Sequence, residues 1–199
     1  IIQNIADWKR VHAESVADSD TFWLAQTEHL VAWEKRPKKG LEGGYDSITE
    51  SSFKWFSDGT LNATVSCLDQ HLDIRGDKVA ILWEGDEPTD IRSITYRELH
   101  ADVCRFSNAL STLGIESGDP VVIYMGMVPE AAVAMLACAR IGAIHSVVFG
   151  GFSAESLRDR VLDCDSKVIV TQDEGMRGGK RIPLKDVCDE ALSAQNPVE

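Results

Sequence analysis

Apolar residues in the last two thirds of the chain follow two alternating patterns. Short continuous apolar runs, typical of strands buried on both faces, alternate with segments whose apolar residues return every three or four positions, as on one side of a helix. The apolar runs lie at 79–83, 121–125, 143–149 and 167–171. The helical segments lie at 95–113, 129–142 and 153–162. Strands of this kind joined by helical crossovers predict an α/β fold, in which a parallel sheet is flanked by helices.

The first of these predicted helices has both ends marked in the sequence. Thr95 and Glu98 have the spacing of a capping box, in which each side chain accepts a hydrogen bond from the backbone amide of the other. Gly114 supplies the left-handed residue that commonly ends a helix. The residues expected on its buried side are Leu99, Val103, Phe106, Leu110 and Leu113.

Three further helices are predicted with fewer signals. Pro129 suits the first position of a helix that runs to Gly142, and Ser153 suits the cap of the next. Upstream, one more set of apolar residues has helical spacing. Its members are Leu61, Val65, Leu68 and Leu72.

Residues 1–60 differ from the rest because they contain four of the five tryptophans. Trp23, Leu30 and Trp33 have the spacing of one amphipathic helix. Asp20 is the predicted N-cap of that helix. We expect residues 1–60 to form an aromatic-rich N-terminal extension that packs on a core formed by residues 61–199.

Composition and charge exclude several classes of protein. A hydrophobic content of 44% and a charged content of 26% are ordinary for a globular protein, and they argue against disorder. The chain carries 20 Lys and Arg against 32 Asp and Glu, for a net charge of −12. General nucleic-acid binders and proteins that bind anionic membranes need a basic surface, so neither partner is expected. The apolar run at 131–139 is too short to span a bilayer.

The cysteines and the first residues bear on the compartment. The five cysteines show no C-x-x-C spacing, which favours buried, reduced thiols and a cytoplasmic protein over a disulfide framework or a zinc site. The chain starts at Ile1 rather than at Met, which indicates processing or cutting. No positively charged leader with an apolar core precedes Asp7.

The most informative candidate for chemistry is a basic segment at 175–185. It contains four basic residues and no acid, and it follows the predicted strand at 167–171, where parallel sheets place ligands. Within it, Arg177 and Lys180 supply a guanidinium fork and an ammonium, while Gly178 and Gly179 let backbone amides approach an anion. One interpretation is a phosphate clamp; the alternative, favoured by local composition, is a solvated basic loop. Neither a Walker A motif nor a G-x-G-x-x-G fingerprint is present.

A second candidate is the turn at 149–153. Its glycines would let the backbone approach a ligand, and the helix after it would offer free amides to an anion. The alternative is a tight turn with a helix cap, and no nucleophile elbow is present.

The remaining titratable residues give weaker signals. The five histidines have no metal-ligand spacing, and His145 and Ser146 are neighbours on a strand, so their side chains should point to opposite faces. The acidic pairs at 86–87 and 173–174 are expected to be solvated rather than catalytic. From the residues alone, the prediction stops at an α/β domain with a candidate phosphate-binding edge.

Several segments taken together resemble the AMP-forming acetyl-CoA synthetases, a family of the adenylate-forming superfamily. The main one runs from Met127 to Ser153, and its block Ala134–Ser153 is highly specific and is shared by the related propionyl-CoA synthetases. The other matching segments are residues 22–23, 54–56, 58–60, 83–86, 96–100, 103–106, 173–180 and 182–185. Residues 83–86 and 102–106 resemble the acetyl enzymes more than the propionyl enzymes.

The resemblance implies that the chain is the first third of such an enzyme and forms part of its large N-terminal domain. Residues 61–199 would be an incomplete first α/β subdomain. The family joins acetate to ATP, giving acetyl-AMP and diphosphate, and the CoA thiol then attacks to give acetyl-CoA and AMP. The ATP loop, the acetate pocket, the hinge and the C-terminal catalytic lysine would lie beyond Glu199. The resemblance therefore places no catalytic group and no metal ligand here, and Mg²⁺ would bind elsewhere in the full enzyme.

The same resemblance assigns Arg177, Gly178, Gly179 and Lys180 to the surface that contacts the nucleotide end of CoA. Phe149 and Gly150 would line that surface. Some members have Arg where this chain has Lys180. Lys keeps the positive charge of that Arg but lacks its guanidinium fork. The family often has Pro at the position of Gly126.

The expected partners are CoA, ATP and acetate, with no nucleic acid and no membrane. The 199-residue chain alone is expected to be inactive and to self-associate through exposed apolar surface. Two alternatives are a propionyl-CoA synthetase fragment and a non-catalytic α/β module that binds a phosphorylated ligand.

Overall fold

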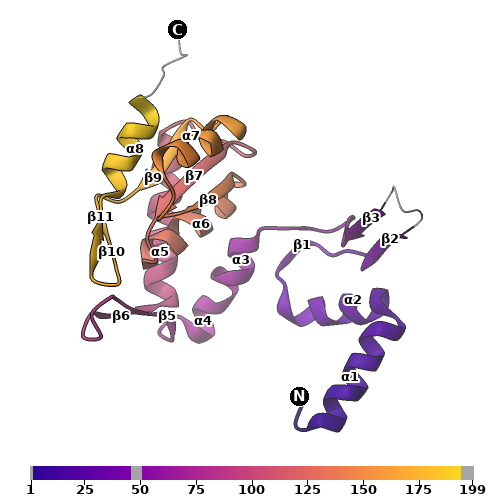
Figure 1. Cartoon of the computed structure of the whole chain (residues 1–199). Helices are drawn as coiled ribbons and strands as arrows, with labels where there is room; N and C mark the ends of the chain where they lie inside the picture. The colour runs from indigo at the N-terminus through magenta and orange to yellow at the C-terminus, as the bar shows by residue number, and fades with distance from the viewer. Residues whose placement is uncertain (1, 46–50, 194–199) are drawn as a thin grey trace. The chain divides into compact units, whose positions relative to one another are not determined.

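The computed structural model describes residues 2–45 and 51–193 (Figure 1). It divides into two compact units, Ile1–Ser66 and Cys67–Glu199. No helix among the described residues is both long enough and apolar enough to cross a bilayer.

The described residues of the first unit include two helices and two small antiparallel sheets. The helices are α1 (Ile5–Ala17) and α2 (Ser19–Leu30). The strands β1 (Trp33–Lys35) and β4 (Thr60–Leu61) form one sheet, and β2 (Leu41–Tyr45) and β3 (Ser51–Trp55) form the other.

Two details of the helix expected in this unit are wrong. Asp18, rather than Asp20, caps α2, because it stands just before the helix, where its carboxylate accepts from the Thr21 amide at 3.1 Å. The Asp20 carboxylate instead accepts from the amides of Gly40 and Leu41, at 2.6 and 2.9 Å. The helix also ends at Leu30, and Trp33 begins β1.

The helix expected through 61–72 is broken into three short pieces. They are α3 (Ala63–Cys67), the 3-10 turn η1 (Asp69–His71) and α4 (Leu72–Arg75). Leu61 lies before them in β4, and the Asn62 side chain accepts from the Thr64 amide at 3.0 Å, which starts the first piece.

The second unit is built on a three-stranded parallel sheet in the order β8-β7-β9. Its strands are β7 (Pro120–Met125), β8 (Ile144–Phe149) and β9 (Val168–Thr171). The helices around it are α5 (Tyr96–Thr112), α6 (Pro129–Ile141), α7 (Ala154–Asp163) and α8 (Leu184–Ser193). The predicted α/β fold with a parallel sheet flanked by helices is confirmed.

The core lies on both faces of the central strand, β7. Val121 and Ile123 pack with residues of α5 and α6 on one face, while Val122 and Tyr124 pack with residues of α7 and α8 on the other. All four side chains are fully buried, because β7 is the strand with a neighbour on each side.

The edge strand β8 departs from the prediction of burial on both faces. Val148 is buried in β8, but Ile144 and Val147 are 59% and 54% exposed. This strand pairs on one side only, with β7, and therefore leaves an apolar surface uncovered in the described structure.

The strand expected at 79–83 exists but does not join the parallel sheet. It is β5 (Val79–Glu84), and it forms a separate antiparallel hairpin with β6 (Ile91–Thr95). The chain reverses in a tight turn, in which the Gly85 amide donates to the Asp90 carbonyl at 2.7 Å. A turn this short joins antiparallel strands only, because parallel strands need a long crossover.

The predicted ends of α5 are confirmed, but one residue that was expected on its buried side is exposed. Thr95 and Glu98 form the capping box, and Gly114 has a φ of +84°. Leu113, however, is 68% exposed, because α5 ends at Thr112 and Leu113 lies past its last turn. Ile115 enters the core instead.

The ends of the next two helices also agree with the sequence. Pro129 stands at the start of α6, and Gly142 ends it with a φ of +78°. The Ser153 hydroxyl accepts from the Ser156 amide at the start of α7.

The five cysteines form no disulfide. Cys138 and Cys188 are buried, as expected, and burial raises the pKa of the Cys138 thiol to about 11. Cys67 is exposed, which departs from the prediction of buried thiols.

Candidate functional site

The carboxyl ends of the parallel strands bring together the loops that follow β7, β8 and β9. Parallel sheets place ligand sites at this edge. The Gln172 side chain joins two of these loops, because its oxygen accepts from the Gly126 amide at 2.9 Å and its nitrogen donates to the Glu174 carbonyl at 2.7 Å. The Gly126 backbone is therefore held by a hydrogen bond.

The turn at 149–153 uses its glycines for internal packing. A Cβ at Gly150 would lie 2.9 Å from the Met125 carbonyl oxygen, and one at Gly151 would lie 2.8 Å from the Phe149 ring. The Tyr124 hydroxyl donates to the Phe152 carbonyl at 2.8 Å and fixes the turn to β7. The structure thus favours the alternative of a tight turn with a helix cap.

Residues 175–182 of the basic segment form a β-hairpin, and its last two residues begin α8. Its strands are β10 (Gly175–Arg177) and β11 (Lys180–Ile182), joined by Gly178 and Gly179. Both glycines have positive φ, of +57° and +72°, as the two central residues of a type I′ turn require. A Cβ at either position would meet no atom within 4 Å, so backbone conformation alone favours glycine here.

Arg177 and Lys180 lie on the same side of this hairpin. They are directly opposed cross-strand partners, and such partners project from one face. The Arg177 guanidinium carbon lies 4.7 Å from the centre of the Phe149 ring, a cation–π contact that ties the hairpin to the end of β8. The structure therefore brings Arg177 next to Phe149, two residues that were expected on one surface.

The amides of Gly178 and Gly179 do not face an open anion site. They donate to the two carboxylate oxygens of Asp86, at 2.9 and 2.6 Å. A carboxylate of the chain thus occupies both amides in this structure, and the role of the two glycines in ligand binding stays a prediction. Asp86 is exposed, as expected, and its carboxylate is also the hydrogen-bond partner of this turn.

Two of the four basic residues in the segment are paired with acids just outside it. Arg181 contacts Glu174 at 2.7 Å, and Lys185 contacts Asp189 at 2.5 Å. The hydrogen bond that Lys185 donates to Asp189 raises the pKa of Lys185. Among residues 2–45 and 51–193, Arg177 and Lys180 form no ion pair, so they carry the positive charge that a ligand would meet.

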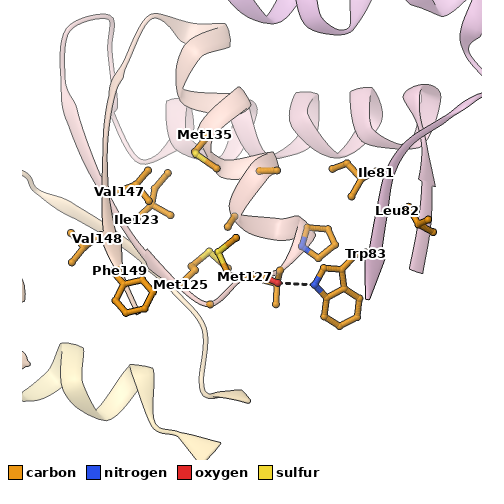
Figure 2. A pocket seen from close by; sticks show the side chains of 15 residues that line it. Ile81, Leu82, Trp83, Ile123, Met125, Met127, Met135, Val147, Val148 and Phe149 are labelled. Atoms are coloured by element: carbon orange, nitrogen blue, oxygen red, sulfur yellow. Dashed lines mark hydrogen bonds between the residues drawn. The ribbon is translucent and has the colours of Figure 1, made fainter. Parts of the chain in front are cut away.

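An apolar cavity of about 400 Å³ adjoins this surface (Figure 2). Its wall includes Trp83, Met125, Met127, Met135, Val147 and Phe149. The Trp83 indole nitrogen donates to the Met127 carbonyl at 2.7 Å, which closes one side of the cavity. Phe149 belongs to both features, since it lines the cavity and supports Arg177.

A second polar cluster lies away from this edge. Asp69 accepts from Arg140, and the His100 ring nitrogen Nε2 lies 3.4 Å from Asp69 and 3.6 Å from the Cys104 sulfur. The part of the chain that the structure describes holds no group of three or more His, Cys, Asp or Glu side chains able to bind a metal ion.

Sequence reasoning missed Asp86 and the cavity. Asp86 lies 92 positions before Gly178, and no spacing rule connects residues so far apart. The cavity depends on the hairpin of β5 and β6, whose pairing was predicted wrongly. The Gly-Gly pair between short polar runs was the one local signal for the second hairpin.

Comparison with protein families gives two matches that together run from residue 8 to residue 198. Residues 68–198 match the model of the AMP-binding enzymes. Residues 8–67 match the model described as the acetyl-coenzyme A synthetase N-terminus.

Curated relatives include several proteins named acetyl-coenzyme A synthetase. The protein of Pseudomonas aeruginosa is 54% identical over 188 residues, which cover 94% of this chain and 29% of the relative. That of Aeromonas salmonicida is 53% identical over 188 residues, with the same coverage. That of Shewanella sediminis is 54% identical over 190 residues, covering 96% of this chain and 29% of the relative. The chain thus spans less than a third of the length of these relatives.

Proposed function

The chain belongs to the family of AMP-binding enzymes, and on that basis we propose that it is the N-terminal part of an AMP-forming acetate–CoA ligase. The identity of more than 50% to proteins named acetyl-coenzyme A synthetase carries this proposal. The complete enzyme would convert ATP, acetate and CoA into acetyl-CoA, AMP and diphosphate through acetyl-AMP, with Mg²⁺ bound by residues outside this chain.

The contribution of this chain is part of the CoA surface, formed by Arg177, Gly178, Gly179 and Lys180. Arg177 and Lys180 share one face of the hairpin, and neither is neutralised by an acid in the described structure. A guanidinium fork beside an ammonium suits the phosphate groups of CoA. The glycines contribute the turn that sets these two side chains opposite each other, and not free amides.

The experiment that tests this role compares two half-reactions in the full-length enzyme that carries these residues. Arg177→Ala should raise the KM for CoA about tenfold, the cost of one charge-assisted contact. Acetate-dependent exchange of diphosphate into ATP does not involve CoA and reports the first half-reaction. The matched control is Arg181→Ala, since Arg181 lies in the same hairpin but is paired with Glu174.

Each result has a distinct meaning. A raised KM for Arg177→Ala and an unchanged KM for Arg181→Ala would support the assignment. An unchanged KM in both variants would contradict the CoA surface. A wild-type enzyme without acetate-dependent exchange would contradict the ligase itself.

The two alternatives predict other results. A propionyl-CoA synthetase would show a higher kcat/KM with propionate than with acetate. A non-catalytic module would bind CoA as the isolated 199-residue chain, which titration calorimetry at millimolar CoA would detect. We expect no such binding, because the cationic surface described here is one-sided.

Self-association of the isolated chain remains a prediction, supported by the exposed apolar side of β8. Ile144→Lys should lower the apparent mass at high protein concentration in sedimentation equilibrium. Leu113→Lys is the matched control, since Leu113 is as exposed but lies at the end of α5. Equal behaviour of the two variants would argue against β8 as the contact.

A further inference from the structure

We propose that Asp86 is a positioning residue for the CoA surface: its carboxylate holds the Gly178–Gly179 turn so that Arg177 and Lys180 meet the ligand as a fixed pair. This inference rests on the proposed function, because it needs the hairpin to bind CoA. Asp86 belongs to a different hairpin from the residues that it would position.

The first step is the geometry of the contact. Two consecutive turn amides point at one carboxylate, with a donor for each oxygen, at 2.9 and 2.6 Å. Successive amides in a turn of this kind form a concave site for an anion. The sequence places an aspartate of the chain there, so the turn is held in its positive-φ conformation by a charged acceptor.

The second step is that Asp86 stands on a hairpin that is itself anchored. Gly85 and Asp90 close the turn beside Asp86 with a backbone hydrogen bond of 2.7 Å. Farther along the same hairpin, the Trp83 indole donates to the Met127 carbonyl, and Arg92 contacts Glu130 of α6 at 2.8 Å. Asp86 therefore connects the 175–182 hairpin to the start of α6 through the hairpin of β5 and β6, which is itself held by these contacts.

The third step concerns what the contact prevents. The 175–182 hairpin has strands of three residues each and no buried side chain in them. The Arg177–Phe149 and Arg181–Glu174 contacts hold its strands but do not reach the two glycines of its turn. A pair of isolated short strands is marginally stable in water. Without the Asp86 contact, Arg177 and Lys180 would have to be ordered when the ligand binds, and that ordering would weaken binding.

The opposite role for Asp86 is competition with the ligand. Its negative charge lies at the turn that joins the strands of the two cations, and it occupies amides that a phosphate could use. A competitor should strengthen CoA binding when it is removed, whereas a positioning residue should weaken it. The sign of the change in KM therefore distinguishes the two roles.

The test uses the full-length enzyme with Asp86→Ala, Asp86→Asn and a control, Glu87→Ala. Glu87→Ala removes the same charge one residue away and keeps the amide contacts. We expect Asp86→Ala to raise the KM for CoA about tenfold, because two charge-assisted hydrogen bonds are lost. Asp86→Asn keeps one acceptor oxygen and should give a smaller rise, while Glu87→Ala and the kcat of all three variants should change less than about twofold.

A second measurement follows the turn directly and does not depend on CoA chemistry. Amide hydrogen exchange of the peptide covering 175–182 should become faster in Asp86→Ala and stay unchanged in Glu87→Ala. Exchange as slow as in the wild type would overturn the proposal, and so would a lowered or unchanged KM in Asp86→Ala. If Arg177→Ala also leaves KM unchanged, the CoA surface fails as well; if it raises KM, the failure is confined to Asp86.

Discussion

Two guanidinium nitrogens of Arg140 donate to the two carboxylate oxygens of Asp69, over distances of 2.8 and 2.9 Å. The pair joins the end of α6 to η1, and less than a third of either side chain is exposed. A bidentate pair in this setting holds its geometry better than a surface ion pair.

Replacement of Arg140 by Met should therefore destabilise the second unit. Asp69 would keep a half-buried charge without its main partner, at a cost of about 2 kcal/mol in the free energy of unfolding. Lys185→Met is the control, since it removes an exposed pair and should cause no measurable change. Urea unfolding followed by circular dichroism measures both. Equal stability of the two variants would contradict this role for Arg140.

The same pair predicts a dependence on pH. The hydrogen bond from Arg140 lowers the pKa of the Asp69 carboxyl below its ordinary value of 3.8. The stabilisation is therefore complete above about pH 4, near the pKa in the unfolded chain, and is lost as the pH falls through the lower folded pKa. The difference in free energy of unfolding between wild type and Arg140→Met should accordingly shrink as the pH falls from 5 toward the folded-state pKa of Asp69. A constant difference over that range would contradict the linkage.

Gly142 and Gly114 both end helices with positive φ, but their surroundings differ. A Cβ at Gly142 would lie 2.6 Å from the Ser117 hydroxyl oxygen, while one at Gly114 would meet nothing within 4 Å. Gly114→Ala should cost about 1 kcal/mol for its backbone alone, and Gly142→Ala should cost more because of the clash. Adding Ser117→Gly should bring Gly142→Ala to the level of Gly114→Ala. Thermal unfolding of the three variants tests this order.

The capping box of α5 gives a local prediction. The Glu98 amide donates to the Thr95 hydroxyl at 3.2 Å, and the Thr95 amide donates to Glu98 at 2.8 Å, which lowers the pKa of Glu98. Thr95→Ala should lower the free energy of unfolding by about 1 kcal/mol. Thr95→Ser keeps the hydroxyl and should therefore lose only a small part of that stability. Loss of stability equal in Ser and Ala variants would show that the hydroxyl does not cap the helix.

The parts of the fold that sequence predicted well are those with local causes. The capping box, the glycines after α5 and α6, and the proline at the start of α6 each depend on a few neighbouring residues. Strand β7 was also predicted, because burial on both faces requires an unbroken apolar run.

The errors arise where partners are far apart in the chain. Apolar spacing marks β5 as a strand but does not say with which strand it pairs, and β6 has only two apolar residues, Ile91 and Ile94. The 175–182 hairpin contains both a successful prediction and an omission. Arg177 and Lys180 were singled out by composition, whereas the bonds from the glycine amides to Asp86 could not be found from one sequence.

The distribution of tryptophan has a practical consequence for spectroscopy. Trp83 is the one tryptophan of the second unit, since Trp8, Trp23, Trp33 and Trp55 all belong to the first. Its indole is hydrogen-bonded beside the apolar cavity, three residues before Asp86. With the other four replaced by Phe, the emission of this chain would come from one fluorophore on the hairpin that supports the basic turn. Its wavelength and quenching would then report the solvent exposure of that hairpin in real time.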